Sequence, residues 1–451
     1  MPIYGGVMAP DAADADTATA PIPVLVKPPK WRDTFSSLRI HNYRLYVMSQ
    51  SISNTSVWMQ RIAIDWLVFE LTGSVTAVGI TAGLQFGPML LFGPFGGVIT
   101  DRFKKRPTMI TTQTIGVILC GVLAALVFTG VVQVWQVYLT ACLLGFVDVV
   151  DQPAKKVFVN EMVGQRHLSN AISVNASIWH LGGLLGPAIS GVMLALVGAG
   201  WAIGINSLAG CLVIIALLAM RKSELLPSLV VEHAKGQIRE ALRYVRSKPS
   251  IFWPMVMLAF VYTFGMNLPV LLVAFADEVF HSGATGYGLY SSAAAVGALA
   301  GAVASTRRIT FRLRFIVFSG GLFGLTLILT GLAPVLSVFL VVLASIGFTR
   351  MLFSTTAEAV VQLSSNRIIR GRVMALYAMI AVGGQALGSP LLGWLAEVAG
   401  ARAAMAISGA VPCVAAIVVA FLLARSGRLS LRFRLRRNSR LMSIEPRGQL
   451  S

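Results

Sequence analysis

Long stretches of mostly apolar residues recur along the whole chain, with short polar segments between them. Each stretch has about 20 residues or more, which is enough for a helix to cross a hydrocarbon core of roughly 30 Å. The pattern therefore predicts an all-α integral membrane protein with twelve transmembrane helices. The predicted spans are residues 43–70, 75–100, 107–130, 133–157, 169–197, 201–220, 250–276, 284–306, 313–332, 334–362, 371–399 and 402–424.

The composition is that of a chain whose solvent is lipid. Of its 451 residues, 56% are hydrophobic and only 12% are charged, which argues against a soluble enzyme. The net charge of +19 would suit a nucleic acid, but its distribution favours membrane topology. If both termini are cytoplasmic, every Lys and Arg except Arg61, Arg350 and Arg402 lies in the N-terminal arm, an inner connection or the tail. We therefore expect both termini inside the cell, anionic lipid headgroups against the tail, and no nucleic acid.

The longest polar interruption follows the sixth span and separates two groups of six spans. The chain is thus expected to have five parts: a mostly disordered cytoplasmic arm at 1–42, an N-terminal half at 43–220, a linker at 221–249, a C-terminal half at 250–424 and a basic cytoplasmic tail at 425–451.

The linker contains a short segment of helical periodicity. Its apolar residues fall on one face and its arginines on the other, which predicts an amphipathic helix lying on the inner membrane surface. The apolar face holds Ile238, Leu242 and Val245, and the basic face holds Arg239, Arg243 and Arg246.

The two groups of spans are related by an internal repeat. A shift of 202 residues places Gly145 on Gly347, Gly182 on Gly384 and Gly186 on Gly388. Glycines at equivalent positions mark close helix contacts, which chance similarity of oily segments would not reproduce. Two parallel repeats related by an axis along the membrane normal predict two pseudo-symmetric six-helix halves.

The loop between spans two and three, residues 96–107, resembles the signature cytoplasmic loop of the major facilitator superfamily. Lys104 stands where a glycine is usual, and the second half has no acid in the equivalent loop beside Arg307 and Arg308. The resemblance implies that the aspartate pairs with the start of the eleventh helix and latches the inner side, as an anion does at a positive helix end. The alternative is ordinary inner-side basic charge with an incidental acid. The matching residues are Gly97, Asp101, Arg102, Lys105 and Arg106.

Span five is similar to the motif of proton-coupled drug antiporters. It has serines where glycines are usual at two positions, and its small residues and proline would let a facing helix pack closely. Ordinary small-residue packing is the alternative, so the motif favours export over import only moderately. Its residues are Ser173, Gly182, Gly186, Pro187, Ser190 and Gly191.

Several short stretches resemble one branch of this superfamily, the bacterial secretion-effector group that includes enterobactin exporters and macrolide efflux pumps. The resemblance covers nearly the whole chain beyond the arm and implies a multi-pass protein of the bacterial inner membrane. It is carried by residues 58–60, 66–74, 151–154 and 239–249.

Charged residues inside spans are costly and are candidates for function. The repeat places Asp148 of span four on Arg350 of span ten, and in the facilitator fold these two helices face each other across the central cavity. We expect Asp148 and Arg350 to form a gate or proton-coupling pair. Alternatively, each extends its charge toward water or pairs elsewhere.

Span one and span five hold further titratable candidates. Arg61 and Asp65 have i,i+4 spacing, so Asp65 is either a second coupling acid or a static partner of Arg61. His180 is either a proton relay or a hydrogen-bonded packing residue.

Polar, aromatic and Met residues in the cavity-lining spans suit recognition of an amphipathic small molecule, although they can equally face lipid. The substrate-cavity candidates are Trp58, Gln60, Trp66, Tyr262, Met266 and Asn267. The cysteines Cys120, Cys142, Cys211 and Cys413 lack metal-ligand spacing, and no ATP-binding loop is present. We therefore expect no cofactor and no metal, with the proton gradient as the energy source.

These observations predict a secondary active exporter of the major facilitator fold, which works as a monomer by rocking of its two halves. The expected reaction is proton-coupled antiport of a siderophore or drug-like molecule, as in multidrug efflux. A lipid or lysolipid flippase of the same fold, with a cavity open sideways to the bilayer, is the rival within transport. A non-transporting membrane sensor or assembly partner is the rival from another class.

Overall fold

A computed structural model describes residues 36–226, 237–306, 313–366, 369–425, 430–433 and 442–445 of the chain. Most of the predicted arm and tail lie outside these residues, as do Arg307 and Arg308, and the side chains of Asp101 and His180 are also outside the description.

The N-terminal half is built from five helices. They are α1 (His41–Thr72), α2 (Val75–Arg102), α3 (Lys105–Phe128), α4 (Val134–Leu196) and α5 (Ala199–Ala219). Helix α4 contains both the fourth and the fifth predicted spans and is broken at Gly164, where φ is 66°. Only glycine adopts this left-handed conformation without strain, so Gly164 allows the chain to reverse without a long loop.

The C-terminal half begins with an interrupted span. This span consists of α7 (Pro249–Phe260), the π-helical turn η5 (Val261–Gly265), α8 (Leu268–Ala274) and the π-helical turn η6 (Phe275–Val279). Pro269 lies in the first turn of α8 and has no N–H to donate, so carbonyls of the preceding turn need another partner. Asn267 supplies it, because its Nδ2 donates to the carbonyls of Thr263 at 2.8 Å and Tyr262 at 3.2 Å.

The remaining helices of this half are longer and continuous. They are α9 (Gly283–Thr306), α10 (Leu313–Gly331), α11 (Leu336–Ser364), α12 (Arg370–Ala399) and α13 (Ala401–Arg425). Shorter elements are the 3-10 turns η3 (Ser36–Arg39) and η4 (Lys222–Glu224), and an antiparallel strand pair in the tail, β1 (Ser430–Phe433) with β2 (Met442–Glu445).

Eleven segments of the described chain are long and apolar enough to cross a membrane, and α1 is the twelfth crossing. Helix α1 has 32 residues but is less apolar than the others, because one side carries buried polar residues. These include Asn42, Gln50, Ser53, Ser56 and Gln60. The low hydropathy of α1 therefore reflects a polar protein interior rather than a segment outside the membrane.

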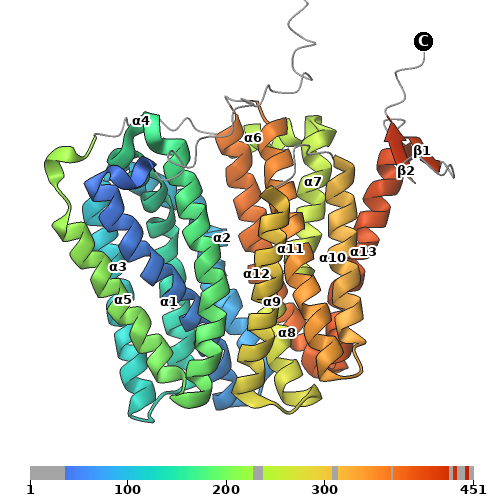
Figure 1. The fold of residues 1–451 in the computed structure, drawn as a ribbon, viewed down its shortest axis with the longest axis horizontal. Helices are drawn as coiled ribbons and strands as arrows, with labels where there is room; N and C mark the ends of the chain where they lie inside the picture. The colour runs from blue at the N-terminus through green and yellow to red at the C-terminus, as the bar shows by residue number, and fades with distance from the viewer. Residues whose placement is uncertain are drawn as a thin grey trace, which may run out of the picture.

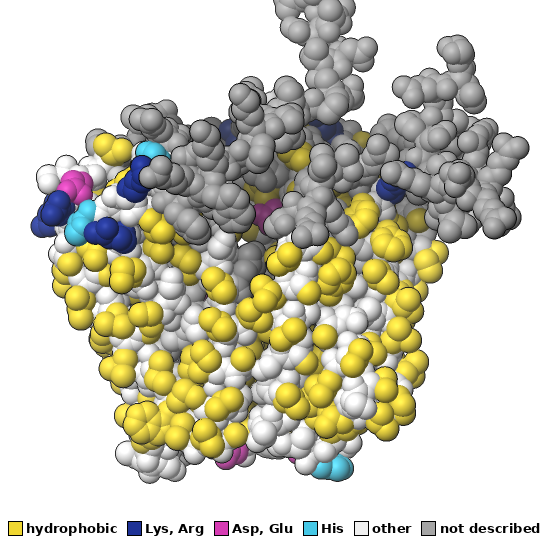
Figure 2. All heavy atoms as spheres, viewed as in Figure 1, with side chains coloured by type: hydrophobic (Ala, Val, Ile, Leu, Met, Phe, Trp, Pro, Cys, Tyr) yellow, Lys and Arg dark blue, Asp and Glu magenta, His cyan; other side chains and the backbone are white. Residues whose placement is uncertain are grey.

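The twelve crossings form two bundles side by side, α1–α5 in one and α7–α13 in the other (Figure 1). Helix α2 packs against α12, and α4 packs against α9, so these pairs join the halves. The upper end in Figure 1 is called the basic end, because the Lys and Arg side chains visible in Figure 2 gather there; the lower end is called the opposite end. Apolar side chains cover the flank between the two ends, as lipid contact requires (Figure 2).

The linker helix α6 (Gln237–Ser247) was expected to lie on the membrane surface, but it packs against the C-terminal half. Ala241 and Val245 are buried, and the helix packs on α7 and α12 rather than presenting its whole apolar face to the membrane. Glu240 pairs with Arg372, and the hydroxyl of Tyr244 accepts from the backbone of Asn366 at 3.0 Å. An amphipathic pattern identifies a buried face but not its neighbour, and here the neighbour is the C-terminal half.

Candidate functional site

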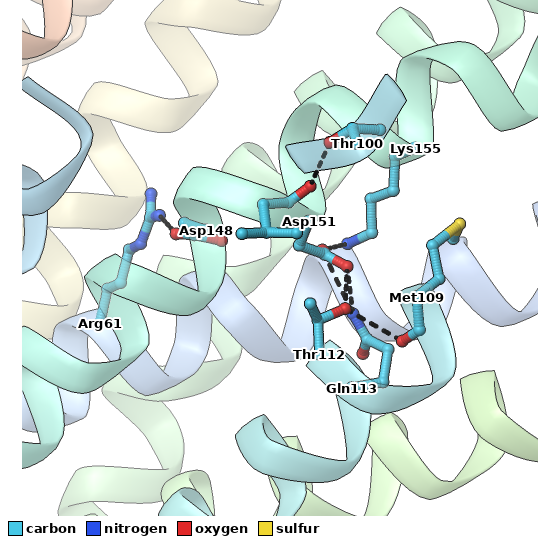
Figure 3. A network of polar contacts seen from close by, with 9 residues as sticks. Arg61, Thr100, Met109, Thr112, Gln113, Asp148, Asp151 and Lys155 are labelled. Carbon is cyan, nitrogen blue, oxygen red and sulfur yellow. Dashed lines mark hydrogen bonds and ion pairs between the residues drawn. The ribbon is translucent and has the colours of Figure 1, made fainter. Parts of the chain in front are cut away.

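A loosely held ion pair lies inside the N-terminal half. The guanidinium of Arg61 on α1 is 3.8 Å from the carboxylate of Asp148 on α4 (Figure 3). The same guanidinium lies over the rings of Trp58 and Phe86, 5.3 Å from each ring centre. The side chain of Asp148 is 35% exposed, whereas that of Arg61 is 15% exposed. The aromatic rings therefore place the arginine, while its carboxylate partner stays accessible.

The predicted pair of Asp148 with Arg350 is not formed. Asp148 turns toward α1 of its own half, and among the described residues Arg350 makes no ion pair. The repeat identifies equivalent positions on α4 and α11, but equivalence does not bring their side chains into contact in every conformation. Arg61 reaches Asp148 because α1 and α4 pack together within one half.

A second acid on α4 has a different environment. The carboxylate of Asp151 accepts from Thr112 at 2.7 Å and from Gln113 at 3.3 Å, and lies 2.6 Å from the ammonium of Lys155 (Figure 3). Its side chain is only 3% exposed. Because its oxygens are fully used, Asp151 ties α3 to α4.

The two acids line one chamber of about 80 Å³ between helices of the N-terminal half. Its other polar lining residues include Gln60, Gln85, Gln113, Lys155 and Asn206. Asn206 donates to the Oε1 of Gln60 at 2.7 Å, but the Nε2 of Gln60 and the Nε of Arg61 are buried with no partner in the described structure. The Nε1 of Trp58 is in the same situation. Three neighbouring donors on α1 are therefore available to acceptors such as water or a ligand.

The C-terminal half has a polar cluster around Arg350 on α11. Arg350 lies beside Tyr262 of η5, whose side chain also interacts with Ser354 and Tyr377. Tyr262 is thus the substrate-cavity candidate that the structure places beside a charged residue of this half. The cluster gives α11 a cation without a carboxylate partner among the described residues.

Asp65 lies at the contact between the two halves, closer to the opposite end than Arg61. It forms no ion pair with Arg61, and its carboxylate accepts from the hydroxyl of Tyr287 on α9 at 3.3 Å. Trp66 stacks on the same tyrosine, with ring centres 5.9 Å apart. The i,i+4 spacing of Arg61 and Asp65 permitted a local pair, but each residue has its partner on another helix.

Glycines show where the halves meet most closely. A Cβ added to Gly191 of α4 would lie 2.2 Å from the Cα of Gly288 on α9, and one added to Gly79 of α2 would lie 2.3 Å from the carbonyl oxygen of Ser389 on α12. Gly393 of α12 meets the carbonyl of Val75 at 2.6 Å in the same way. All three contacts are toward the opposite end, where the backbones approach so closely that no side chain fits between them.

Glu397, near the end of α12, is a contact that sequence reasoning missed. Its side chain is exposed, and its carboxylate accepts from the hydroxyl of Thr76 at 2.6 Å and from the backbone N–H of Thr76 at 3.0 Å, and also from the hydroxyl of Ser74. Ser74 and Thr76 begin α2, so an acid of one half caps a helix of the other. No pattern in the sequence indicates this contact between distant segments.

The halves are apart at the basic end. Gly97 of α2 has nothing within 4 Å of an added Cβ, although it lies on the same face of α2 as the contact residues Gly79 and Gly83. Among the described residues, every hydrogen bond between the halves is made by Asp65 or Glu397, toward the opposite end. The structure therefore represents a conformation closed at the opposite end.

The remaining residues of the predicted latch loop make contacts within their own half. Arg106 donates to the carbonyls of Leu217 at 2.7 Å and Leu218 at 3.1 Å, at the end of α5. Lys105 is buried and donates to the carbonyl of Phe103, while Arg102 is exposed. Arg106 thus stabilises a helix C-terminus, where cations are favoured.

The small residues of span five pack α4 against α1. Gly182 meets the backbone of Asn54, Gly186 meets Trp58, and the hydroxyl of buried Ser190 donates to the carbonyl of Met59 at 3.0 Å. Pro187 is buried in the same stretch, whereas Ser173 is exposed.

Two of the substrate-cavity candidates are used internally. Asn267 is 4% exposed and, besides its two backbone bonds, accepts from Ser389 at 2.7 Å. Met266 is also buried. Asn267 therefore braces the interrupted span against α12, and Trp58, Gln60 and Tyr262 remain as candidates with polar atoms near a chamber or a charged group.

The sequence model of the transmembrane secretion effector family matches residues 32–439 of the chain. Curated relatives include the enterobactin exporter EntS of Citrobacter koseri, which is 26% identical over 84% of this chain and 91% of its own length. The enterobactin exporter EntS of Shigella flexneri is also 26% identical, with the same coverage.

Solved structures of similar fold include a bacterial homologue of the human lysosomal transporter Spinster, described as inward-facing and unoccupied. It has a TM-score of 0.67 and 16% identity, with 86% of this chain and 98% of that chain covered. The POT family transporter PepTSo has a TM-score of 0.67 and 16% identity, covering 88% of this chain and 99% of its own. At these identities the likeness establishes the fold alone.

Proposed function

Because the chain belongs to the transmembrane secretion effector family, a branch of the major facilitator superfamily of transporters, we propose that it is a secondary active exporter driven by the proton gradient. It exchanges protons for an amphipathic small molecule of the siderophore or drug-like class. The observation that carries the proposal is the pairing of Arg61 with Asp148, in which an accessible acid lies 3.8 Å from a half-buried cation.

The basic end is assigned to the cytoplasm. Lys and Arg are concentrated in the connections and termini at this end, and such a bias sets the orientation of multi-span proteins. With this orientation the conformation described above is closed toward the outside and would load substrate from the cytoplasm, as an exporter requires.

Asp148 is the proposed proton carrier. Its neighbour Asp151, three residues along the same helix, has every oxygen engaged and is nearly inaccessible, so a proton there would break several bonds. Asp148 has one long ion pair with Arg61, interacts with the side chain of Gln152 on its own helix, and has a third of its side chain exposed. Protonation of Asp148 therefore costs one weak ion pair and one local contact, and it frees the guanidinium of Arg61.

The freed guanidinium and its neighbours suit a substrate with oxygen acceptors. The unpartnered donors of Gln60 and Arg61 belong to residues that line the chamber, and the rings of Trp58 and Phe86 provide apolar contact beside Arg61. A polar group with acceptors attached to an aromatic or apolar body matches this arrangement. The curated relatives named as enterobactin exporters support the siderophore class for this chain.

Transport by pure protein in liposomes tests the proposal. Substrate taken from the producing organism's medium should move only when a proton gradient is imposed, and the flux should be abolished in Asp148→Asn, which binds but cannot exchange a proton. Glu224→Gln is the matched control, because Glu224 forms an exposed surface pair with Arg221. Gradient-independent flux, or full gradient-driven flux in Asp148→Asn, would refute proton antiport through this acid. Movement of labelled phospholipid in place of the solute would favour the flippase.

A further inference from the structure

The chamber lined by the two acids of α4 is too small to receive the body of the substrate. Its volume is about 80 Å³. Pockets that enclose drug-sized molecules have about 300–1,000 Å³. Trp58 and Phe86, whose rings lie over the guanidinium of Arg61, are not among the described residues that line it. Arg61 therefore has two sides, one toward the aromatic rings and one toward the chamber.

The chamber brings together donors and an acceptor that the protein leaves incompletely paired. The Nε2 of Gln60 and the Nε of Arg61 are buried and have no acceptor among the described residues. The side chain of Gln60 is only 3% exposed, so bulk solvent does not serve this donor. Across the chamber, the carboxylate of Asp148 is 3.8 Å from the guanidinium of Arg61, which is longer than a hydrogen bond. Buried polar groups almost always have a partner, so these groups indicate a partner other than protein.

The charges that line the chamber balance, which selects the kind of partner. Arg61 and Lys155 are the lining cations, and Asp148 and Asp151 are the lining anions. A bare ion placed among them would lose its hydration and would meet repulsion as well as attraction. A neutral molecule that both donates and accepts can serve the two unpaired donors and the carboxylate of Asp148 together. Water is the smallest molecule with both properties.

We propose that the chamber is an internal water site, whose ordered molecules bridge Gln60 and Arg61 to the carboxylate of Asp148. A volume of about 80 Å³ holds about three to five waters, if each takes about 15–30 Å³. Through these waters Asp148 exchanges its proton inside the N-terminal half, on the side of Arg61 away from the aromatic rings. The role of Asp148 as proton carrier rests on the proposed function, but the presence of the water does not.

Water in the chamber has two consequences for the pair of Arg61 and Asp148. A pair in dry surroundings attracts strongly, whereas water beside it weakens the attraction and solvates each charge when the two separate. An oxygen of Asp148 can also take a proton from the adjacent water, which takes one in turn from the next water, so that no charge stays in the chamber. The proton and the substrate then approach the pair from different sides, and neither blocks the other.

Hydroxyl-radical footprinting of the purified, full-length protein tests whether water occupies the chamber. An X-ray pulse forms radicals from water, including water held inside a protein, and these oxidise the nearest side chains. Cys120 lines the chamber although it is only 1% exposed. Met257 also carries sulfur and is fully buried, but it belongs to α7 of the C-terminal half. After correction for intrinsic reactivity, Cys120 should be oxidised severalfold faster than Met257.

Gly116 of α3 provides a way to fill the chamber. It lines the chamber, and nothing lies within 4 Å of a Cβ added to it. Gly116→Val should therefore displace water and lower the oxidation of Cys120 severalfold. Ala125→Val is the matched control, because Ala125 is exposed on the same helix and is not among the lining residues, so the oxidation of Cys120 should stay unchanged.

A second variant removes a polar partner of the water instead of its space. Gln60→Met nearly keeps the size of the side chain but loses the amide, so water is held less well and the oxidation of Cys120 should fall. This variant tests the site even if Gly116→Val does not fold.

Two kinds of flux in liposomes test the role of the water in transport. With substrate from the producing organism's medium, Gly116→Val should slow gradient-driven flux severalfold. Exchange of labelled for unlabelled substrate without a gradient needs no net proton movement, so it should match that of Ala125→Val. Equal loss of both fluxes in Gly116→Val would overturn the role of the chamber in proton exchange.

The water site itself is overturned if Cys120 is oxidised no faster than Met257. It is also overturned if the oxidation of Cys120 is unchanged in Gly116→Val or, where that variant does not fold, in Gln60→Met. These outcomes are independent of flux. A hydrated chamber in a protein without gradient-driven flux would defeat the proposed exporter and leave the water site standing, and gradient-driven flux with a dry chamber would do the reverse.

Discussion

A substitution at the contact of Gly191 with Gly288 should shift the equilibrium between the conformation closed at the opposite end and the conformation open there. Alanine at position 191 would place its Cβ 2.2 Å from the Cα of Gly288 and 2.9 Å from its carbonyl carbon, where ordinary contacts begin near 3.4 Å. The backbones of α4 and α9 must then separate by about 1 Å, and neither atom belongs to a flexible side chain. Overpacking of this kind costs about 1–3 kcal/mol. Because the clash exists only when the opposite end is closed, the cost falls on that conformation alone.

Gly191→Ala should therefore shift the equilibrium about 5-fold to 150-fold toward the state open at the opposite end, the range that corresponds to such a coupling energy. Spin labels at Lys222→Cys, just after α5, and at Gln362→Cys, near the end of α11, are both on exposed positions toward the basic end and report the shift as a shorter distance there. Gly116→Ala on α3 is the control, since nothing lies within 4 Å of an added Cβ there and the gain in helix propensity is the same. If both variants show the same distance distribution, the glycine contact does not discriminate between the states and the reasoning fails.

Three further substitutions separate stabilising residues from transporting ones. Asp151→Asn should lower the free energy of unfolding in detergent by about 1–3 kcal/mol, because it leaves the half-buried ammonium of Lys155 beside a neutral amide, whereas Asp148→Asn should change it by less than about 1 kcal/mol. Equal losses would contradict the distinction between the two acids. Arg106→Gln should lower the free energy of unfolding by about 1–2 kcal/mol, because the hydrogen bonds to the last carbonyls of α5 are lost, and Arg106→Lys should recover part of this loss. An unchanged thermal melt in Arg106→Gln would count against a capping role for Arg106. Asn267→Ala should cost about 1–3 kcal/mol, because the hydroxyl of Ser389 and the carbonyl of Thr263 lose their partner, and a melt unchanged from the parent would show that water replaces the amide.

The twelve crossings were predictable because the thickness of the bilayer sets the length of each apolar run. The duplication was predictable because the two halves keep matching residues. An apolar run must be long enough to span the bilayer, and a shared ancestor leaves glycines such as Gly182 and Gly384 in register. Local conformation within a span was less predictable. Nothing in the hydropathy indicates that the break in the seventh span needs Asn267 to satisfy freed carbonyls, since that depends on which helix packs beside it.

The candidate site was predictable as a set of residues but not as a set of contacts. Charged residues in an apolar span are few, so Arg61, Asp148 and Arg350 stood out by composition alone. Which of these charges pair depends on which helices are in contact. The internal repeat shows which positions are equivalent, but it does not show whether their side chains are in contact in a given conformation. Glu397 was missed for a related reason: an acid near the end of a span is expected to be solvated, and its partner lies 321 residues away in the chain.

The two acids of α4, Asp148 and Asp151, illustrate two uses of a charge inside a membrane protein: taking part in transport and holding helices together. Both acids line the same chamber, but the side chain of Asp148 is 35% exposed and that of Asp151 is 3% exposed. The partners differ as well: Asp151 has a cation, a hydroxyl and an amide on its oxygens, all from α3 or α4, whereas Asp148 has a long ion pair with Arg61 at 3.8 Å and the side chain of neighbouring Gln152. A fully bonded charge resists every change of partner, so it can only hold helices together. A transport cycle needs charges that exchange partners at low cost, and Asp148 and Arg350 are places where this structure provides them.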